Sequence, residues 1–329
     1  MTPIAPHITA FLRERLPLQR GASEHTCDSY AYAFQLLFQF ASARLRVTPS
    51  SLYLEQIDAP LVMDFLQHLE TERHNSPRTR NARLVAIKSF MRFVEYRMPS
   101  LLEQSRRILA IPAKRTDIRL ISYLSLEEMQ ALLNAPDLQR RDGIRDRAML
   151  HLCFSAGLRV SELVGLPLQS LEWQPSPSVR IQGKGRRERL LPLWKQTAAD
   201  LRAWLAVRGQ LPALELFVNA DGQPMTRSGF EYILRKHAHA AAEHCPSLQK
   251  KRISPHVLRH TAAMVVLQAT GDIRKVSLWL GHTDIQTTEA YLRADPTEKL
   301  EAMGAVVPPA LKCGRFNVPD KLIASLRGL

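Results

Sequence analysis

The sequence predicts a mainly α-helical protein with a small β-sheet, divided into two domains. A chain of 329 residues is too long for one small core. Apolar residues recur every three or four positions along most of the chain, which is the period of amphipathic helices. Residues 178–193 instead alternate apolar and polar side chains around a Gly-Lys-Gly turn, which predicts one β-hairpin.

The first hundred residues are expected to be entirely helical. An apolar stripe with helical period runs through residues 26–44, and a second apolar stretch follows Pro60. Ser76 can cap a third helix whose first turn holds Pro77. We expect an N-terminal helical domain over residues 1–105. Residues 106–123, with Pro112, several charges and no helical period, are expected to form a linker.

The second domain is expected over residues 124–295. Ser125 and Glu128 form a capping box, and a later helix should stop at Gly157. Helical period returns after the hairpin, and a short strand with a turn is expected at residues 216–225. The domain should close with three helices, separated by Gly271 and Gly281: His256–Thr270, Asp272–Leu280 and Ile285–Arg293. Residues 296–329 form a proline-containing tail.

The charge balance points to a polyanionic partner. The formal net charge is +14 and the isoelectric point is near 10.0. No apolar run approaches the ~20 residues that span a bilayer, and the first residues lack the order of a secretory signal, so we expect a cytoplasmic protein with no membrane contact. The four cysteines lie far apart without a CxxC pair, which predicts neither disulfides nor a zinc site.

One predicted helix is much more basic than the rest of the chain. Between Arg73 and Arg97 there are seven lysines or arginines and a single acid, Glu95. This pattern favours contact with a nucleic-acid backbone, and a solvated helix face is the alternative. The candidate DNA-binding residues on this helix are Arg78, Arg80, Arg83 and Lys88.

His256 and Arg259 lie three residues apart at the start of a predicted helix. They therefore share one face, close to free amide groups that favour anions, which predicts a phosphate site. His260 is one turn from His256, and such a pair can bind a metal. Because no third ligand is evident, we expect no metal site.

Four motifs occur in a fixed order: "AGLRVSELVGL" (residues 156–166), "GKGRRERLLPL" (183–193), "SPHVLRHTAA" (254–263) and "LGHTDIQTTEAY" (280–291). In this order they resemble the catalytic boxes of the tyrosine recombinase family, the phage integrases and Xer-like enzymes. The resemblance covers residues 124–293. More loosely, "SPRTRNARLVAIKSFMRFVEY" resembles the family's helical, SAM-like core-binding domain, which precedes a mixed α/β catalytic domain.

The resemblance implies a site-specific DNA recombinase or integrase that cuts and rejoins DNA through a 3′-phosphotyrosyl intermediate. Tyr291 matches the nucleophile, Arg159 and Arg259 the pair that holds the phosphate, and Lys184 the acid that protonates the leaving 5′ oxygen. The implied catalytic set is Arg159, Lys184, His256, Arg259, His282 and Tyr291. His256 and His282 would bond the scissile phosphate, and His256 could help deprotonate Tyr291. Glu162 is either a partner that orients Arg159 or a surface acid, and Arg186 and Arg187 would contact DNA.

The implied partners are double-stranded DNA and further copies of the chain, in a tetramer on two DNA sites. A sister recombinase or an accessory factor could also take part, and the tail could dock on a neighbouring protomer. Neither a metal nor a nucleotide cofactor is implied. The alternatives are a type IB topoisomerase-like strand transferase, a non-catalytic sequence-specific DNA-binding regulator, and a metal-dependent nuclease built on His256 and His260.

Overall fold

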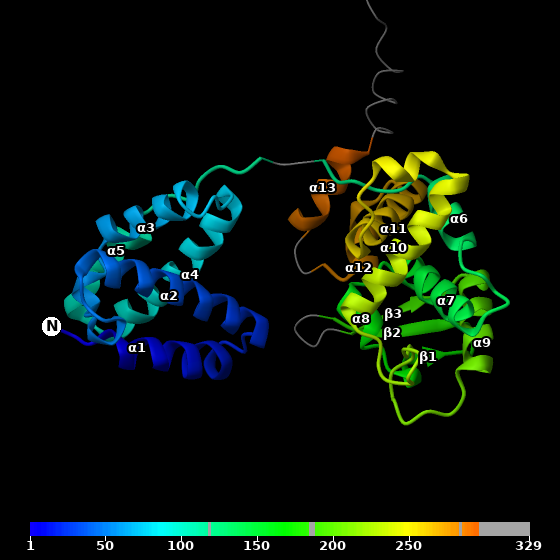
Figure 1. Ribbon diagram of the computed structural model, residues 1–329, viewed down its shortest axis with the longest axis horizontal. Coiled ribbons are helices and arrows are strands. Elements are labelled where there is room, and N and C mark those ends of the chain that lie inside the picture. The colour runs from blue at the N-terminus through cyan, green and yellow to red at the C-terminus, as the bar shows by residue number, and fades with distance from the viewer. Residues whose placement is uncertain (118–119, 184–187, 283–284, 296–329) are drawn as a thin grey trace, which may run out of the picture. The chain divides into compact units, whose positions relative to one another are not determined.

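The computed structural model describes residues 1–117, 120–183, 188–282 and 285–295 (Figure 1). The chain divides into two compact units, Met1–Ile118 and Arg119–Leu329. We call them the N-terminal unit and the C-terminal unit. Each has a hydrophobic core of its own, as expected of separate domains.

The N-terminal unit is helical, as predicted. Its segments are α1 (Ile4–Ala10), a π-helical continuation (Phe11–Gln19), α2 (Glu24–Leu45), α3 (Ala59–Thr71), α4 (Pro77–Arg97) and α5 (Leu102–Leu109). The core is rich in aromatic rings: the centroid of the Phe90 ring lies 5.3 Å from that of Phe34 and 5.4 Å from that of Phe11. Ser76 caps α4 as predicted, accepting a hydrogen bond from the backbone of Thr79.

The expected linker differs from the structure in its first part. Residues 106–109 belong to α5, and Ile108 and Ile111 are buried in the core of the N-terminal unit. The chain beyond α5 is bonded to α4, because Asn81 donates to the backbone oxygen of Lys114 and accepts from its backbone nitrogen. Composition concealed this boundary, since the apolar residues Ile108, Leu109 and Ile111 that pack against the core are interspersed with charged residues and Pro112.

The C-terminal unit is a helical domain with a small sheet. Its helices are α6 (Leu126–Asn134), α7 (Arg141–Ser155), α8 (Val160–Val164), α9 (Lys195–Arg208), α10 (Arg227–His244), α11 (Pro255–Thr270), α12 (Ile273–Leu280) and α13 (Gln286–Ala294). Helix α7 is its centre: residues 148–155 are all buried, and the helix packs against α6, α9 and α11. The capping box at Ser125 is present as predicted.

The sheet is antiparallel, in the order β1 (Leu171–Glu172), β2 (Ser178–Gln182), β3 (Glu188–Pro192). Strands β2 and β3 form the predicted hairpin, with Gln182 opposite Glu188. The strand expected over residues 216–225 is reduced to a single bridge between Val218 and Pro224. Helix α10, the longest in this unit, was not anticipated from the sequence.

The last three helices of the described chain agree with the prediction. Gly271 ends α11 and Gly281 ends α12, both in the left-handed conformation that glycine adopts most readily. Ser254 caps α11, with Pro255 in its first turn. These turns bring α11, α12 and α13 together at one side of the C-terminal unit (Figure 1).

Candidate active site

Arg259 is a buried cation held by backbone oxygens. Its side chain donates to the carbonyl of Gly157 at 2.5 Å and to that of Leu280 at 2.8 Å, and the residue is 4% exposed. Burial and then the nearby charge of Arg159 lower the pKa of Arg259 to about 10, so it stays protonated at neutral pH. The guanidinium therefore links the end of α7 to the end of α12.

Gly157 makes this linkage possible. Its φ is +57°, and a Cβ atom there would lie 2.7 Å from Cδ2 of Leu280. A larger residue would strain the backbone and displace the side chain of Leu280, the residue that supplies the second carbonyl to Arg259. The sequence prediction that the preceding helix stops at Gly157 thus has a structural reason.

Glu162 is the acidic residue that pairs with the arginines of the site. It accepts a hydrogen bond from Nη1 of Arg159 at 2.8 Å and from Nη2 of Arg189 at 2.8 Å, and Nη1 of Arg259 lies 3.9 Å away. Burial raises its pKa, but the hydrogen bonds and charges of Arg189 and Arg159 outweigh burial and keep the pKa below its ordinary value. One buried carboxylate therefore holds three guanidiniums together.

Tyr291 lies on α13 between two histidine rings. Its hydroxyl is 3.0 Å from Nδ1 of His260, and its ring stacks on that of His282 with centroids 6.5 Å apart and planes 12° apart. The residue is 2% exposed, and burial raises its pKa, while Arg259 and Arg159 act in the opposite direction. The phenol is thus protonated and enclosed beside the arginines.

The histidines of the site differ in environment. Nδ1 of His282 is 2.8 Å from the hydroxyl of Thr288, and burial followed by the charges of Arg259 and Arg159 lowers its pKa to about 4. His260 also has a pKa lowered to about 4, by burial first and then by His256 and Arg259. His256 is exposed, and its ring stacks on that of His260 at 6.5 Å.

The structure brings together most of the residues that the sequence singled out. Those in one cluster are Arg159, Glu162, His256, Arg259, His282 and Tyr291. Lys184, Arg186 and Arg187 lie outside the described residues. Two members of the cluster were not assigned to it from the sequence, His260 and Arg189. The available signals were the one-turn spacing of His260 from His256 and the position of Arg189 in the predicted hairpin.

The basic helix α4 gives a mixed result. Arg78 is exposed, whereas Arg80 is 7% exposed and donates to the carbonyl of Pro112. Arg83 donates to the backbone of Ser29 and lies over the ring of Tyr32. Burial, and then the charges of Arg92 and Arg80, lower the pKa of Lys88, so α4 carries a concentrated positive charge. Of the four candidates, Arg80 and Arg83 are engaged within the unit.

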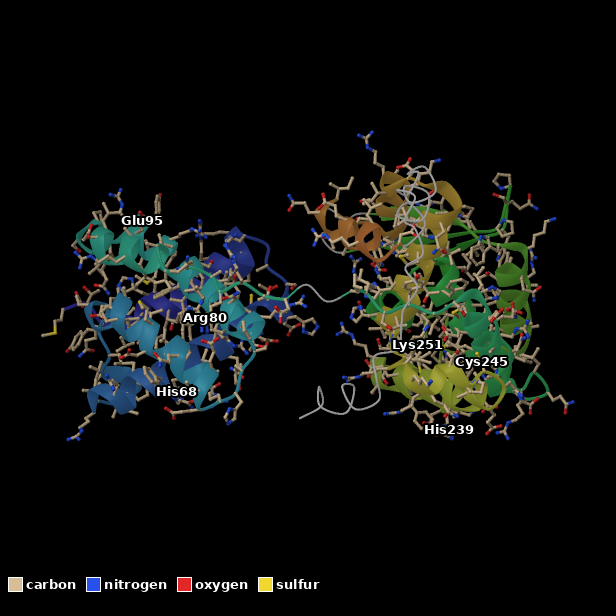
Figure 2. The ribbon with its side chains drawn as sticks, turned by 90° about the horizontal axis from the view of Figure 1, so that it is seen from above. His68, Arg80, Glu95, His239, Cys245 and Lys251 are labelled. Atoms are coloured by element: carbon tan, nitrogen blue, oxygen red, sulfur yellow. The ribbon has the colours of Figure 1, made fainter. Side chains whose placement is uncertain are left out.

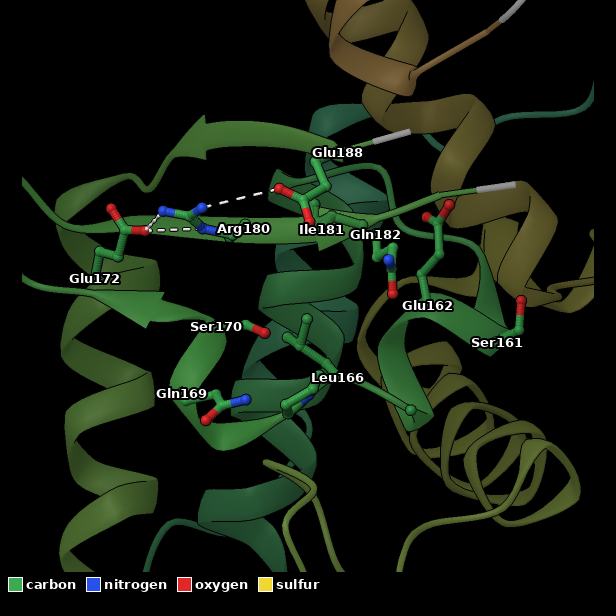
Figure 3. A pocket seen from close by; sticks show the side chains of 12 residues that line it. Ser161, Glu162, Leu166, Gln169, Ser170, Glu172, Arg180, Ile181, Gln182 and Glu188 are labelled. Atoms are coloured by element: carbon green, nitrogen blue, oxygen red, sulfur yellow. Dashed lines mark hydrogen bonds and ion pairs between the residues drawn. The ribbon is translucent and has the colours of Figure 1, made fainter. Parts of the chain in front are cut away.

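A pocket of about 550 Å³ opens beside the site, between α8 and the hairpin. Figure 3 shows Arg180 in this pocket, bonded to Glu172 and paired with Glu188, with Glu162 at the far end. The pocket is lined by three carboxylates, those of Glu162, Glu172 and Glu188, and by one cation, Arg180. This lining does not suit an anionic ligand. Within the described part of the chain, no three His, Cys, Asp or Glu side chains are grouped so that they could hold a metal.

Comparison with known proteins identifies the family. The phage integrase family model matches residues 122–298, and the phage integrase N-terminal SAM-like domain matches residues 8–97. The chain belongs to the phage integrase family. It is a site-specific recombinase of the tyrosine type, and its SAM-like helical unit and mixed catalytic unit are those that the sequence predicted.

Relatives match along nearly the whole chain. The chain is 42% identical to "Putative integrase/recombinase y4rC" of Sinorhizobium fredii, over 99% of its own length and 98% of the relative's. It is 32% identical to the tyrosine recombinase XerC of Pelobacter propionicus, over 94% of its length and 98% of the relative's.

Solved recombinases share the fold. The XerH recombinase bound to a palindromic difH substrate, in a post-cleavage complex, has a TM-score of 0.68 and 20% identity, over 87% of this chain and 81% of that one. A lambda integrase tetramer on a Holliday junction has a TM-score of 0.60 and 13% identity, over 88% and 77%.

None of the helices in the described part of the chain combines the length and apolar character needed to cross a bilayer.

Proposed function

We propose that this recombinase cuts and rejoins double-stranded DNA by transesterification, with Tyr291 as the nucleophile of a 3′-phosphotyrosyl intermediate. The observation that carries the proposal is that the buried phenol of Tyr291 contacts His260 and His282, near enough to Arg259 and Arg159 for their charges to act on its pKa. The likeness to solved DNA complexes of XerH and lambda integrase supports DNA as the substrate.

Each residue of the cluster has a role in this reaction. Arg159 and Arg259 bond the non-bridging oxygens of the scissile phosphate, whose negative charge grows as Tyr291 attacks. Glu162 orients Arg159 and offsets the repulsion between the guanidiniums. His256 and His282 donate to the phosphate from either side of the tyrosine. Lys184 gives a proton to the leaving 5′ oxygen.

Positive side chains bind the DNA backbone outside the reacting centre. We assign this role to Arg78 and Lys88 on α4 and to Arg186 and Arg187, which lie between β2 and β3 in the sequence. Arg80 and Arg83 act instead by holding the N-terminal unit together, because their hydrogen bonds lie within it. In this proposal the side-chain cations supply the charge stabilisation at phosphorus, and the reaction uses no metal or nucleotide.

The assembly is proposed to be a tetramer on two DNA sites in the cytoplasm, formed from copies of this chain with or without a sister recombinase or an accessory factor. The tail, residues 296–329, is proposed to dock on the neighbouring protomer. A variant truncated after Val307 should then lose synaptic tetramers on DNA while retaining DNA binding, as measured by native gel electrophoresis. Normal tetramers and normal recombination by this variant would contradict the docking.

A nicked suicide substrate tests the chemistry directly. When the nick lies next to the scissile phosphate, the short 5′ product diffuses away and the covalent complex accumulates. We expect wild type to form a denaturation-resistant protein–DNA band and Tyr291→Phe to form none while binding the same DNA. If wild type binds the DNA but forms no covalent product, the proposal is wrong and the non-catalytic DNA-binding regulator becomes the favoured function. Activity on one site without a partner site would favour the topoisomerase-like alternative.

A further inference from the structure

The proton on Tyr291 must leave when the phenol becomes a nucleophile, and from the sequence His256 was the residue expected to help remove it. A phenol with a pKa raised by burial is not ionised at neutral pH. Its oxygen therefore attacks efficiently only if a neighbouring base takes the proton as the bond to phosphorus forms. The group that performs this step must lie within hydrogen-bond reach of the phenolic oxygen.

His260 meets this requirement in the described structure. Its Nδ1 lies 3.0 Å from the Tyr291 hydroxyl, and the two rings are 5.6 Å apart at an angle of 61°. His260 is on α11, which packs against α13, so the contact is fixed by two helices. It is also the residue that directly follows Arg259, so a single helix positions both the phosphate clamp and this histidine.

The other histidines are engaged differently. Nδ1 of His282 lies 2.8 Å from the hydroxyl of Thr288, so this nitrogen is already engaged with a neighbour other than Tyr291. His256 is exposed on the first turn of α11 and stacks on the His260 ring. His256 is therefore accessible to a phosphate, and the ring of His260 lies between it and the phenol.

The protonation state of His260 suits a base. Because its pKa is lowered to about 4, the imidazole is neutral at physiological pH, and one of its nitrogens carries a free electron pair. The groups that face it and favour the neutral form are His256 and Arg259, in addition to burial. In the DNA-free protein the phenol and imidazole therefore form a neutral pair.

We propose that His260 is a catalytic residue, the general base that accepts the phenolic proton of Tyr291 at Nδ1 during DNA cleavage. The Oη–H bond breaks as the Oη–P bond forms, and the proton moves to Nδ1. The P–O5′ bond breaks in the same displacement, and the 5′ oxygen takes a proton from the general acid, assigned above to Lys184. In rejoining, the 5′ hydroxyl attacks phosphorus and returns its proton to Lys184, the Oη–P bond breaks, and the imidazolium returns its proton to Tyr291. This inference rests on the proposed function.

The transfer is coupled to attack for a physical reason. A free phenolate beside an imidazolium is unfavourable here, since the pKa of Tyr291 is raised and that of His260 is lowered. Once Oη is bonded to phosphorus it becomes an ester oxygen with little basicity, and the proton then prefers the imidazole. The neutral pair consequently keeps the nucleophile unreactive until a phosphate is in place.

A single-turnover assay on the nicked substrate tests the proposal. His260→Ala should slow formation of the covalent complex by about 10²–10⁴-fold, the range that general bases contribute. His260→Asn should be similarly slow, because an amide can keep the hydrogen bond near Nδ1 but cannot take the proton. His239→Ala is the matched control and should match wild type: His239 is an exposed histidine on α10, at the outer edge of the C-terminal unit in Figure 2.

Fluorinated tyrosine at position 291 separates a base from a structural role. Ring fluorines that bring the phenol pKa below the assay pH make the base unnecessary, so His260→Ala should recover to within about tenfold of wild type carrying the same fluorotyrosine. A structural defect would persist with either tyrosine. DNA affinity of each variant is measured on the same substrate, and if His260→Ala does not fold, His260→Asn decides.

The outcomes are distinct. Normal cleavage by His260→Ala, recovery by His260→Asn, or failure of the fluorotyrosine to restore the rate would each overturn the base while leaving Tyr291 as nucleophile. Covalent complex formation by Tyr291→Phe would instead overturn the proposed function itself.

Discussion

The two units of this recombinase handle charge in opposite ways. The N-terminal unit packs phenylalanine rings in its core and leaves Arg78, Arg92 and Arg97 of α4 exposed. The C-terminal unit draws Arg259, Glu162 and Arg189 into one buried cluster. Desolvating charges is costly unless each finds a partner, so the stability of the second arrangement depends on Glu162 and that of the first does not. Substitutions in the two units should therefore fail for different reasons.

Removing the carboxylate of the C-terminal cluster should have the largest effect. Glu162→Ala leaves Arg159, Arg189 and Arg259 without their common partner, and we expect unfolding free energy to fall by about 3–5 kcal/mol. Denaturant unfolding of the full chain measures the loss, and the suicide substrate should show little covalent complex. A change below about 1 kcal/mol would mean that solvent already screens the cluster.

The aromatic core of the N-terminal unit should be more tolerant. Phe90→Leu removes ring contacts with Phe11 and Phe34 but leaves an apolar side chain, and it should cost about 1–2 kcal/mol. Thermal unfolding checks this. Single-turnover cleavage at saturating DNA should be unchanged, because the substitution touches no charge of the active site, and a slowed chemical step would contradict the division between the units.

Two glycines provide a finer comparison within the C-terminal unit. Gly281 and Gly271 have φ of +65° and +62°, so alanine strains both by about 1 kcal/mol. A Cβ at Gly281 would lie 2.9 Å from Nη1 of Arg189, whereas nothing lies within 4 Å at Gly271. Both variants should lose similar stability, but Gly281→Ala alone should slow cleavage. Equal cleavage rates would show that Arg189 adjusts freely.

The buried histidines make stability depend on pH. His260 and His282 have pKa values lowered to about 4 in the folded protein, against an ordinary value of about 6.5 when unfolded. The unfolded chain binds more protons between these values, so stability falls as pH drops from about 6.5 towards 4. His260→Asn should flatten this dependence in urea titrations at pH 7 and pH 5. If the stability of His260→Asn depends on pH as steeply as that of wild type, groups other than His260 cause the pH dependence.

The smallest effect on the protein itself is expected on the surface of α4. Arg78→Ala should leave stability unchanged and reduce the slope of log affinity against log salt by about 1. Arg80→Ala should do the reverse, lowering stability without changing the slope, because its guanidinium faces Pro112. If Arg80→Ala reduces the slope of log affinity against log salt and Arg78→Ala does not, Arg80 is the residue that contacts DNA and Arg78 is not.

Local rules made much of the fold predictable. Ser76, Ser125 and Ser254 each begin a helix by capping it, and Gly271 and Gly281 end helices through a conformation that other residues avoid. These signals act over a few residues and are readable in the sequence. The start of the linker could not be read from the sequence, because the end of α5 depends on the burial of Ile108 and Ile111 against residues distant in the sequence.

The candidate site divides in the same way. The motif order pointed to Arg159, Arg259, His282 and Tyr291, since a resemblance preserves residue types and their sequence. It could not indicate that Glu162 is shared with Arg189, or that His260 meets a hydroxyl 31 positions away. Such contacts depend on how helices pack, and a side chain's spacing along one helix does not specify its neighbours on another.

The hydrogen bonds between Asn81 and Lys114 have a further consequence. In the C-terminal unit, the backbone oxygen of Tyr123 accepts a hydrogen bond from Lys251, and Ile121 packs against a small apolar cluster of α11 and α12. In the proposed DNA complex, a short connection raises the effective concentration of one unit at the duplex once the other has bound, so overall affinity exceeds that of either unit alone. Asn81 thus shortens the stretch of chain that is free to extend from the N-terminal unit, because it holds Lys114 against α4.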